Sequence, residues 1–468
     1  MGKLSGFYKN VSYTFSSNLL SLIISTIVTL VVPKILGVEE YGYFQLYIFY
    51  TSYVGFLHFG LCDGIYLKYG GFEYSQLDKS LFKGQLIILG MMEIIITLPI
   101  VVIIISYFND QYDNMLVLLF ASFNIIVLNI RTFFMYVLQA TNRMKEFSII
   151  TVLDRIFYII IVIGLICLKS TTVPYLMIAD LFGKSVSLIY AFYVCREIVK
   201  SNRITWSFEE ALDNIKIGMN LMISTLCSIL IMGVVRFGIQ TNWSVEVYGK
   251  VALTLSISNM LMIFVNAVSL AIFPLLKRVD ESKYEQIYPL IKNILIPIVF
   301  LGLLGYYPIY FLLSIWLPEY HDALRFMSIV FPMVVFESKV SLLSSTYLKA
   351  LRKEKIMFKI NVTTAVLSVI LTVINVNLFN SLFLALISIV ILTSFRSILS
   401  EYFLSKFIKI QIKKDCFLDV VLSAVFISGN WLLGQQKGFF IFSISLIFYF
   451  FYKKEDFREI FQFVKSEV

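Results

Sequence analysis

The chain alternates long apolar runs with short polar breaks along its whole length. The apolar runs are about 20 residues long, and a helix of that length covers roughly 30 Å of hydrocarbon. A backbone surrounded by lipid must satisfy its own hydrogen bonds, so we predict membrane-spanning helices. The predicted spans are 12–32, 41–61, 84–106, 115–138, 147–168, 173–195, 214–240, 248–275, 288–314, 322–347, 356–378, 382–405, 417–434 and 437–452, fourteen in all.

Two of the polar breaks are duplicated. The core of the first break, which runs from Pro33 to Gly42, returns roughly 200 residues later as Val245 to Gly249, and this indicates an internal repeat. A second pair, Leu138-Gln139-Ala140 and Leu348-Lys349-Ala350, recurs at nearly the same offset, and basic residues follow both copies. Duplications of this size in a membrane protein are typical of transporters built from two related bundles.

The repeats should be parallel, because their basic loops fall on the same side of the membrane and each repeat must then hold an even number of helices. We therefore predict an all-α integral membrane fold with two parallel six-helix repeats around a central cleft, followed by two extra helices. The expected divisions are an N-terminal lobe (1–195), a cytoplasmic linker (196–213), a C-terminal lobe (214–405) and an appendage with a cytoplasmic tail (406–468).

Composition excludes a soluble protein. Of 468 residues, 59% are hydrophobic and 15% are charged, and the mean hydropathy is +0.84, which is far more apolar surface than a soluble core could hide. The net charge of +9 lies in short loops, so it reflects topology and not nucleic-acid binding. Five scattered cysteines and two histidines indicate no disulfide framework, no metal site and no cofactor.

The distribution of basic residues predicts the orientation. With the N-terminus in the cytoplasm and alternate loops assigned in turn, the outer loops hold only Lys34, Lys169 and Lys437, while the other lysines and arginines of the loops fall on the cytoplasmic side. Both termini, the 196–213 linker and the loop at 349–355 are therefore expected in the cytoplasm. We read the N-terminal apolar run as an uncleaved first span, because it lacks a cleavage site of the A-x-A kind.

Ionisable residues inside predicted spans are costly and commonly mark a transport pathway. We expect five cations to line a substrate cleft: Arg131, Lys184, Arg236, Lys339 and Arg396. Three acids are candidates for charge pairing or ion coupling: Glu93, Asp180 and Glu337.

Structural roles are the alternatives. Asp180 and Lys184 are four residues apart and can pair on one helix face. Arg131 could instead neutralise Glu337, and Arg236 could extend to the membrane interface. The pair Asp154-Arg155, together with Arg325, lies close enough to predicted span ends that we expect anchoring there.

Nothing in the sequence predicts catalysis. There is no phosphate-binding loop of the form G-x-x-x-x-G-K-[ST], no nucleophile elbow and no H-E-x-x-H motif. The aspartates do not cluster on a soluble face as a glycosyl-transfer site would require. We therefore predict that the protein is not an enzyme.

Several motifs of the first half resemble the polysaccharide-repeat-unit flippases of bacteria, the Wzx-type transporters of O-antigen or capsule. They are Pro33-Lys34-x-Leu36-Gly37-x-Glu39-x-Tyr41-Gly42-x-Phe44-Gln45-Leu46, Phe59-Gly60-Leu61-x-Asp63-Gly64 and Gln139-Ala140-Thr141-Asn142-Arg143. The resemblance extends from about residue 7 to 405. Such flippases belong to the multidrug/oligosaccharidyl-lipid/polysaccharide exporter superfamily, whose members have two six-helix lobes and work by alternating access.

The resemblance implies that undecaprenyl-pyrophosphate-linked oligosaccharide is moved to the outer leaflet of the bacterial inner membrane. A cationic cleft could complement the diphosphate while the lipid tail stays in the bilayer. It also implies membrane lipids, a coupling proton or sodium ion, and a polysaccharide polymerase with its chain-length machinery as partners. One departure is Val235 before Arg236, where we expected an acid, so ion coupling at that position is in doubt.

Three other functions stay open at this stage. A multidrug or toxic-compound cation antiporter of the same superfamily would need an acidic, aromatic pocket, whereas the spans hold more bases than acids. A membrane-embedded polysaccharide polymerase or transferase would need a large outer loop or a carboxylate cluster. A purely structural membrane scaffold would leave the buried charges unexplained.

Overall fold

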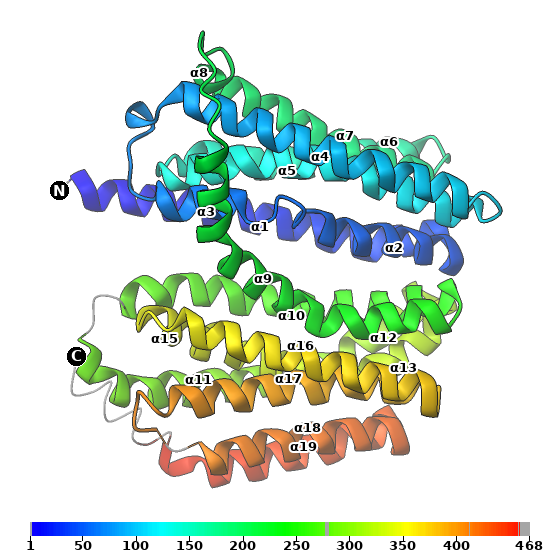
Figure 1. Cartoon of the computed structure of the whole chain (residues 1–468). Helices are drawn as coiled ribbons and strands as arrows, with labels where there is room; N and C mark the ends of the chain where they lie inside the picture. The colour runs from blue at the N-terminus through cyan, green and yellow to red at the C-terminus, as the bar shows by residue number, and fades with distance from the viewer. Residues whose placement is uncertain (1, 277–279, 411, 457, 459–468) are drawn as a thin grey trace. The chain divides into compact units, whose positions relative to one another are not determined.

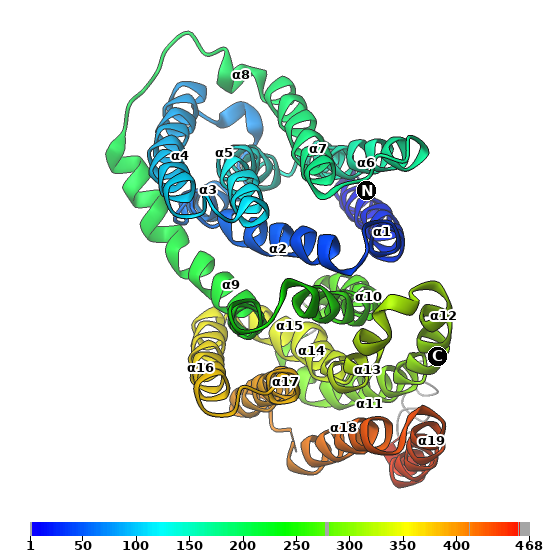
Figure 2. The ribbon, with the colours of Figure 1, turned by 90° about the vertical axis from the view of Figure 1, so that its right-hand side faces the viewer.

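The computed structural model describes residues 2–276, 280–410, 412–456 and 458. These residues divide into two compact units, 1–226 and 227–468, and the division falls inside one long helix. Within each unit the helices run side by side (Figure 1), and Figure 2 shows them close to end-on. Each unit is described separately below.

The first unit is formed by the first half of the chain. Most of its helices are long and are joined by short turns, and α9 continues into the second unit. Its elements are α1 (Gly2–Leu36), α2 (Val38–Val54), α3 (Leu61–Lys68), η1 (Tyr74–Gln76), α4 (Lys79–Tyr107), α5 (Tyr112–Ala140), α6 (Met144–Cys167), α7 (Val173–Val194), α8 (Arg196–Val199) and α9 (Phe208–Asn242).

The second unit contains more interrupted helices. A 49° bend separates the segment ending at Val330 from the one starting at Met333. Its elements are α10 (Val245–Leu276), η2 (Glu281–Lys283), α11 (Tyr284–Leu303), α12 (Tyr306–Trp316), η3 (Pro318–Tyr320), α13 (His321–Val330), α14 (Met333–Ser338), the π-helical η4 (Lys339–Ser344), α15 (Ser345–Ala350), α16 (Glu354–Ile374), the π-helical η5 (Asn375–Phe379), α17 (Leu382–Leu404), α18 (Lys413–Leu433) and α19 (Gln435–Tyr452).

The protein is a multi-pass membrane protein. Among the described residues, ten helical segments are long and apolar enough to cross a membrane, or eleven if the bent pair counts as one span. The other three predicted spans correspond to α2, α10 and α19. Because α2 has 17 residues, it extends only about 26 Å at 1.5 Å per residue. A total of fourteen crossings therefore stays a prediction at these three helices.

The predicted duplication is confirmed in the backbone. After α5, Asn142 has a left-handed φ of 59°, and after α15, Arg352 has a φ of 54°. Both turns are closed by the same bond: Arg143 N donates to Leu138 O at 2.8 Å, and Lys353 N donates to Leu348 O at 2.8 Å. All these positions differ by 210, so the two turns are copies.

A third pair of turns extends the match. Lys169, after α6, has a φ of 52°, and Asn380, after η5, has a φ of 44°. Their separation of 211 residues agrees with the offset of the first two turns. The all-α, duplicated membrane fold expected from the sequence is thus confirmed.

The predicted second span, 41–61, is interrupted. Helix α2 ends at Val54 and α3 begins only at Leu61, because Phe59 and Gly60 adopt φ values of 48° and 86°. A Cβ built on Gly64 would lie 1.8 Å from the carbonyl oxygen of Asn214. Glycine therefore lets the backbones of α3 and α9 touch, and the break turns α3 toward α9.

The predicted linker and C-terminal appendage also look different in the structure. Helix α9 begins at Phe208, so the last six residues assigned to the 196–213 linker are helical. Helices α18 and α19 pack on each other, and they also pack on α13 and α11. The two last helices therefore pack against other helices of the second unit, and their separation from a six-plus-six core stays a prediction.

Candidate functional site

Arg131 is held by carboxylate and hydroxyl groups inside the first unit. From α5, its Nη1 lies 2.6 Å from Asp154 Oδ2 on α6 and donates to Ser187 Oγ on α7 at 3.1 Å. The side chains are 14% and 5% exposed for Arg131 and Asp154. The expectation that Asp154 anchors a span end is wrong, because its carboxylate is buried against an arginine.

Lys184 and Asp180 form the ion pair that their spacing predicts, and both side chains are buried. The hydroxyl of Tyr47, on α2, donates to Asp180 Oδ2 at 2.5 Å. Asn124, on α5, in turn donates from Nδ2 to the Tyr47 hydroxyl at 2.9 Å. A chain of polar contacts therefore joins α2, α5 and α7 in the middle of the first unit.

The two pairs lie in one region because α6 and α7 approach closely. A Cβ built on Gly183 would lie 2.5 Å from the carbonyl oxygen of Asp154, which only a glycine avoids. We call Arg131, Asp154, Asp180 and Lys184 the first-unit charge cluster. With two cations and two carboxylates it is electrically balanced, as buried charges generally must be.

The second unit contains an arginine–glutamate pair of its own. From α17, Arg396 Nη1 lies 3.3 Å from both carboxylate oxygens of Glu337 on α14, and Nη2 donates to Ser228 Oγ on α9 at 2.7 Å. Near the turn between α9 and α10, Arg236 Nη2 donates to the Tyr248 hydroxyl at 2.8 Å. Both arginines thus have partners within their own unit.

Lys339 belongs to a larger network. Its Nζ lies 2.8 Å from Glu401 Oε2 on α17 and 2.7 Å from Asp419 Oδ2 on α18. On α11, Lys292 Nζ lies 2.9 Å from Glu401 Oε1 and 3.0 Å from an oxygen of Asp415.

Lys453 completes this network at the end of α19. Its Nζ lies 2.8 Å from Asp415 Oδ1. Burial lowers the pKa of the Lys453 ammonium, but its hydrogen bonds to Asp415 and Asp456 outweigh burial and hold that pKa above the usual value. The buried charge network, as we name it, comprises three cations and three carboxylates: Lys292, Lys339, Lys453, Glu401, Asp415 and Asp419.

Comparison with known proteins identifies the family. The family model described as polysaccharide biosynthesis protein matches residues 7–280, which is more than half of the chain. The chain belongs to the polysaccharide biosynthesis protein family. No curated protein matches the sequence.

Solved structures show which fold this member of the polysaccharide biosynthesis protein family has. An inward-facing multidrug resistance MATE family transporter of the MOP superfamily superposes with a TM-score of 0.56 at 13% identity, covering 86% of this chain and 96% of that one. A MATE structure in complex with MaD5 gives a TM-score of 0.51 at 13% identity, with 85% and 96% covered. At these identities the likeness concerns the fold, and family and fold together indicate a transporter.

The five cations expected to line a cleft are distributed over separate clusters. Arg131 and Lys184 share the first-unit charge cluster, whereas Lys339, Arg236 and Arg396 have different partners in the second unit. The suggested pairing of Arg131 with Glu337 is replaced by Arg131 with Asp154 and Arg396 with Glu337. Roles of the five cations in substrate binding stay predictions.

Sequence reasoning missed most of the buried charge network. Lys292, Glu401 and Asp419 lie within the first or last nine residues of their helices, where charges usually reach the interface, so they were not singled out. One signal was available: Asp415 and Asp419 are four residues apart on α18 and share a face. Lys339 alone, deep in its span, pointed to the network.

Glu93, on α4, is the third acid proposed for pairing or coupling, and its surroundings differ from those of the other two. It is fully buried, and neither carboxyl oxygen has a hydrogen-bond partner among the described residues. Asn129, on α5, lies beside it. A buried carboxylate without a cation is costly, so the neutral acid is the favoured form.

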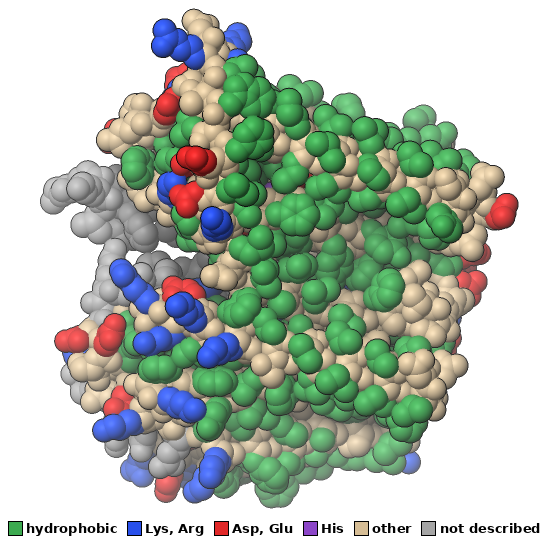
Figure 3. Space-filling model, viewed as in Figure 1, with side chains coloured by type: hydrophobic (Ala, Val, Ile, Leu, Met, Phe, Trp, Pro, Cys, Tyr) green, Lys and Arg blue, Asp and Glu red, His purple; other side chains and the backbone are tan. Residues whose placement is uncertain are grey.

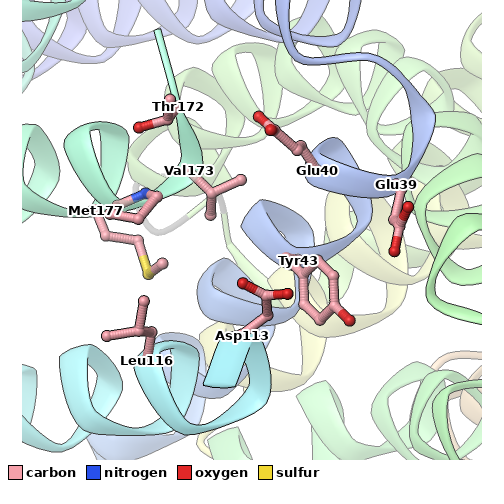
Figure 4. A pocket seen from close by; sticks show the side chains of 9 residues that line it. Glu39, Glu40, Tyr43, Asp113, Leu116, Thr172, Val173 and Met177 are labelled. Carbon is pink, nitrogen blue, oxygen red and sulfur yellow. The ribbon is translucent and has the colours of Figure 1, made fainter. Parts of the chain in front are cut away.

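An acidic pocket lies in the first unit, and Figure 4 shows the side chains that line it. Its carboxylates belong to loops that are predicted to face outward. Glu39, Glu40 and Asp113 line a cavity of about 240 Å³ together with the start of α7. Burial, followed by the charges of Asp113 and Glu39, raises the pKa of Glu40. The sequence predicted no binding role for these carboxylates, because they lie in predicted loops, although Glu39 is part of the motif that carries the family resemblance.

Proposed function

We propose that the protein moves an undecaprenyl-pyrophosphate-linked oligosaccharide, an O-antigen or capsule repeat unit, across the bacterial inner membrane by alternating access. The observation that carries this proposal is the family match over residues 7–280. The duplicated transporter fold supports it, because two related bundles are the usual architecture for alternating access. The termini and the 196–213 linker would face the cytoplasm, where repeat units are made.

The substrate chemistry fits the arginines of both units. A sugar and diphosphate cannot cross hydrocarbon unaided. Arginine binds phosphate through two parallel hydrogen bonds, which a lysine cannot do. Arg131 and Arg396 have side chains that are 14% and 10% exposed, so each guanidinium is partly open to such a headgroup.

Glu93 is our candidate for ion coupling. Asp180 and Glu337 are already paired with Lys184 and Arg396. Glu93 makes no ion pair with a described residue, so a proton could neutralise it in one state of the transport cycle and leave it in another. A polymerase with its chain-length machinery would take the repeat unit after its delivery to the outer leaflet.

Export of cationic compounds is the second candidate function. The acidic pocket of Glu39, Glu40 and Asp113 favours it, because carboxylates attract cations. No arginine is among the residues that line that pocket, which lies at the predicted outer end of the first unit. A cation exporter would raise drug resistance without any effect on surface polysaccharide.

The test is complementation in the native host with its own gene deleted. Cells lacking the protein should accumulate lipid-linked repeat units facing the cytoplasm and should lose surface polysaccharide. Re-expression should restore both. Normal polysaccharide in the deleted strain, together with raised sensitivity to organic cations, would replace the flippase proposal with the cation exporter.

Variants of Arg131 separate substrate contact from structure. Arg131→Lys keeps the charge but removes the planar fork, so polysaccharide export should fall at normal protein abundance. The matched control is Lys145→Ala, because Lys145 is exposed and makes no ion pair with a described residue. If Arg131 only neutralises Asp154, Arg131→Ala should lower abundance and Asp154→Ala should restore it in the double variant.

A further inference from the structure

An apolar groove lies on the surface of the second unit between α18 and α19. Its volume is about 630 Å³, and its lining includes Leu418, Val421 and Val425 from α18 with Phe448 and Tyr452 from α19. Val421 is 41% exposed and Phe448 is 69% exposed. The groove is therefore open on one side to whatever surrounds these helices.

Lys414 lies on the same face of α18 as the residues that line the groove. Leu418, Val421 and Val425 follow Lys414 by four, seven and eleven residues on α18, a spacing that places all four on one helix face. Lys414 is exposed and lies in the first turn of the helix. A molecule lying in the groove would therefore meet a positive charge at this end.

More positive charge surrounds Lys414. Segment 406–414 holds four lysines and no acid, and segment 349–359 holds five basic residues and one glutamate. The two segments are adjacent, because Lys353 Nζ lies 4.9 Å from the ring centre of Phe407. Figure 3 shows Lys and Arg side chains gathered where α15, α16 and α17 meet their loops. Among the described residues, none of these nine cations makes an ion pair.

In the first unit, in contrast, basic residues of the loops are matched by acidic residues. In segment 196–216, four basic residues are matched by four acidic ones. Lys68 lies 2.9 Å from both Glu210 and Asp213, and Arg143 lies 2.7 Å from Glu146. Orientation in the membrane requires basic loops, but it does not require them to lack acidic partners. The unpaired charge of the second unit thus needs another explanation.

We propose that the α18–α19 groove and the lysines of segment 406–414 form a binding site for an anionic phospholipid. The acyl chain lies in the groove, and the headgroup phosphate contacts Lys413 and Lys414. A lipid fits better than an acidic protein, because the groove offers an apolar surface in line with the charge. This proposed lipid site does not rest on the identity of the transported substrate.

The experiment uses the full chain in nanodiscs of phosphatidylcholine with a trace of phosphatidylglycerol that carries a photoactivatable acyl chain. Cross-linked peptides are mapped by mass spectrometry. We expect labelling within 418–425 and 445–452, displaced by unlabelled phosphatidylglycerol at roughly tenfold lower amounts than by phosphatidylcholine. Raising NaCl from about 0.05 M to about 0.5 M should reduce that preference, because salt screens exposed charges.

Two matched pairs of variants test the two parts of the site. Lys413→Gln with Lys414→Gln should abolish most of the headgroup preference, whereas Lys145→Gln with Lys200→Gln, at the first unit's basic end, should not. Val421→Trp should fill the groove and reduce labelling, whereas Val366→Trp on the exposed surface of α16 should not.

Three outcomes would overturn the site. Equal displacement by both phospholipids would mean ordinary boundary lipid. Unchanged labelling in Val421→Trp would show that the acyl chain does not lie in the groove. Displacement by undecaprenyl phosphate at lower amounts than by phosphatidylglycerol would assign the groove to the carried lipid instead.

Discussion

The buried charge network makes the second unit sensitive to the loss of any single charge, and Asp419→Asn is the sharpest way to perturb it. Asp419 Oδ2 lies 2.7 Å from Lys339 Nζ, and both side chains are almost fully buried. The change keeps the size of the side chain and removes one negative charge. Lys339 and Lys292, whose side chains are 1% and 4% exposed, would then share one fully buried carboxylate, that of Glu401.

The expected cost follows from that imbalance. Removing one partner of a buried ion pair typically costs about 3–5 kcal/mol, because the other charge is left uncompensated. For a unit of this size, 1 kcal/mol shifts the melting temperature by roughly 2–4 °C. Asp419→Asn should therefore lower the melting temperature by about 6 °C or more. Lys250→Ala is the control: its partner Asp322 is 66% exposed, and exposed pairs contribute at most about 1 kcal/mol.

A double variant tests whether charge imbalance causes the loss of stability. Lys339→Met with Asp419→Leu removes one charge of each sign, so Lys292 and Lys453 remain opposite Glu401 and Asp415. The double variant should recover much of the stability that Asp419→Asn loses. The melting temperatures of the wild type and the three variants are measured by heating detergent-solubilised protein and quantifying the folded fraction by size-exclusion chromatography. A double variant at least as unstable as Asp419→Asn would refute charge balance as the cause.

Three further outcomes are expected. Glu93→Gln should fold normally, since the neutral acid is already favoured, and should abolish transport if Glu93 carries the coupling proton; full transport would exclude that role. Gly183→Val should lower protein abundance, because its Cβ would meet the Asp154 carbonyl oxygen at 2.5 Å, whereas Gly90→Val has no atom within 4 Å and should not. A phosphatase fusion in the 196–213 linker should be inactive, and activity there with none from a fusion at 109–114 would invert the topology.

The duplicated architecture could be predicted from sequence because the breaks between helices carry local signals. Apolar runs set the helices, and the repeated Leu138 and Leu348 motifs set the turns. The structure adds that both turns use a left-handed residue, Asn142 in one and Arg352 in the other. Arginine is an unusual choice for that backbone conformation, so no residue-type rule would have found the second turn. Only the repeated motif places a turn at Arg352.

The partners of the charges could not be predicted in the same way. A helix pattern shows that Asp180 and Lys184 share a face, and that pair is confirmed. It cannot show which neighbouring helix supplies the partner of Arg131, because that depends on how α5, α6 and α7 pack. Asp154 was assigned to a span end for this reason. The interruption at Phe59 and Gly60 was likewise hidden inside an apolar run.

The two units repeat a backbone without repeating its charges. With the offset of 210, Arg131 corresponds to Ser341, and with the offset of 211 that follows the turns at Lys169 and Asn380, Arg396 corresponds to Ser185. The arginine therefore lies on α5 in the first unit and on α17, the counterpart of α7, in the second. Shared folds host different sites in this way.

The pairing of each arginine sets a condition for transport. A diphosphate headgroup that binds Arg131 must compete with Asp154, whose oxygen already lies 2.6 Å away. Binding is favourable only if the headgroup, which carries more charge than one carboxylate, outweighs the loss of that pair, or if Asp154 finds another cation. Lys184 already acts electrostatically on Asp154, but it also forms the ion pair with Asp180. If Arg131 turns to the substrate, Lys184 alone faces two buried carboxylates, so one of them must take up a proton or the headgroup must offset the excess negative charge.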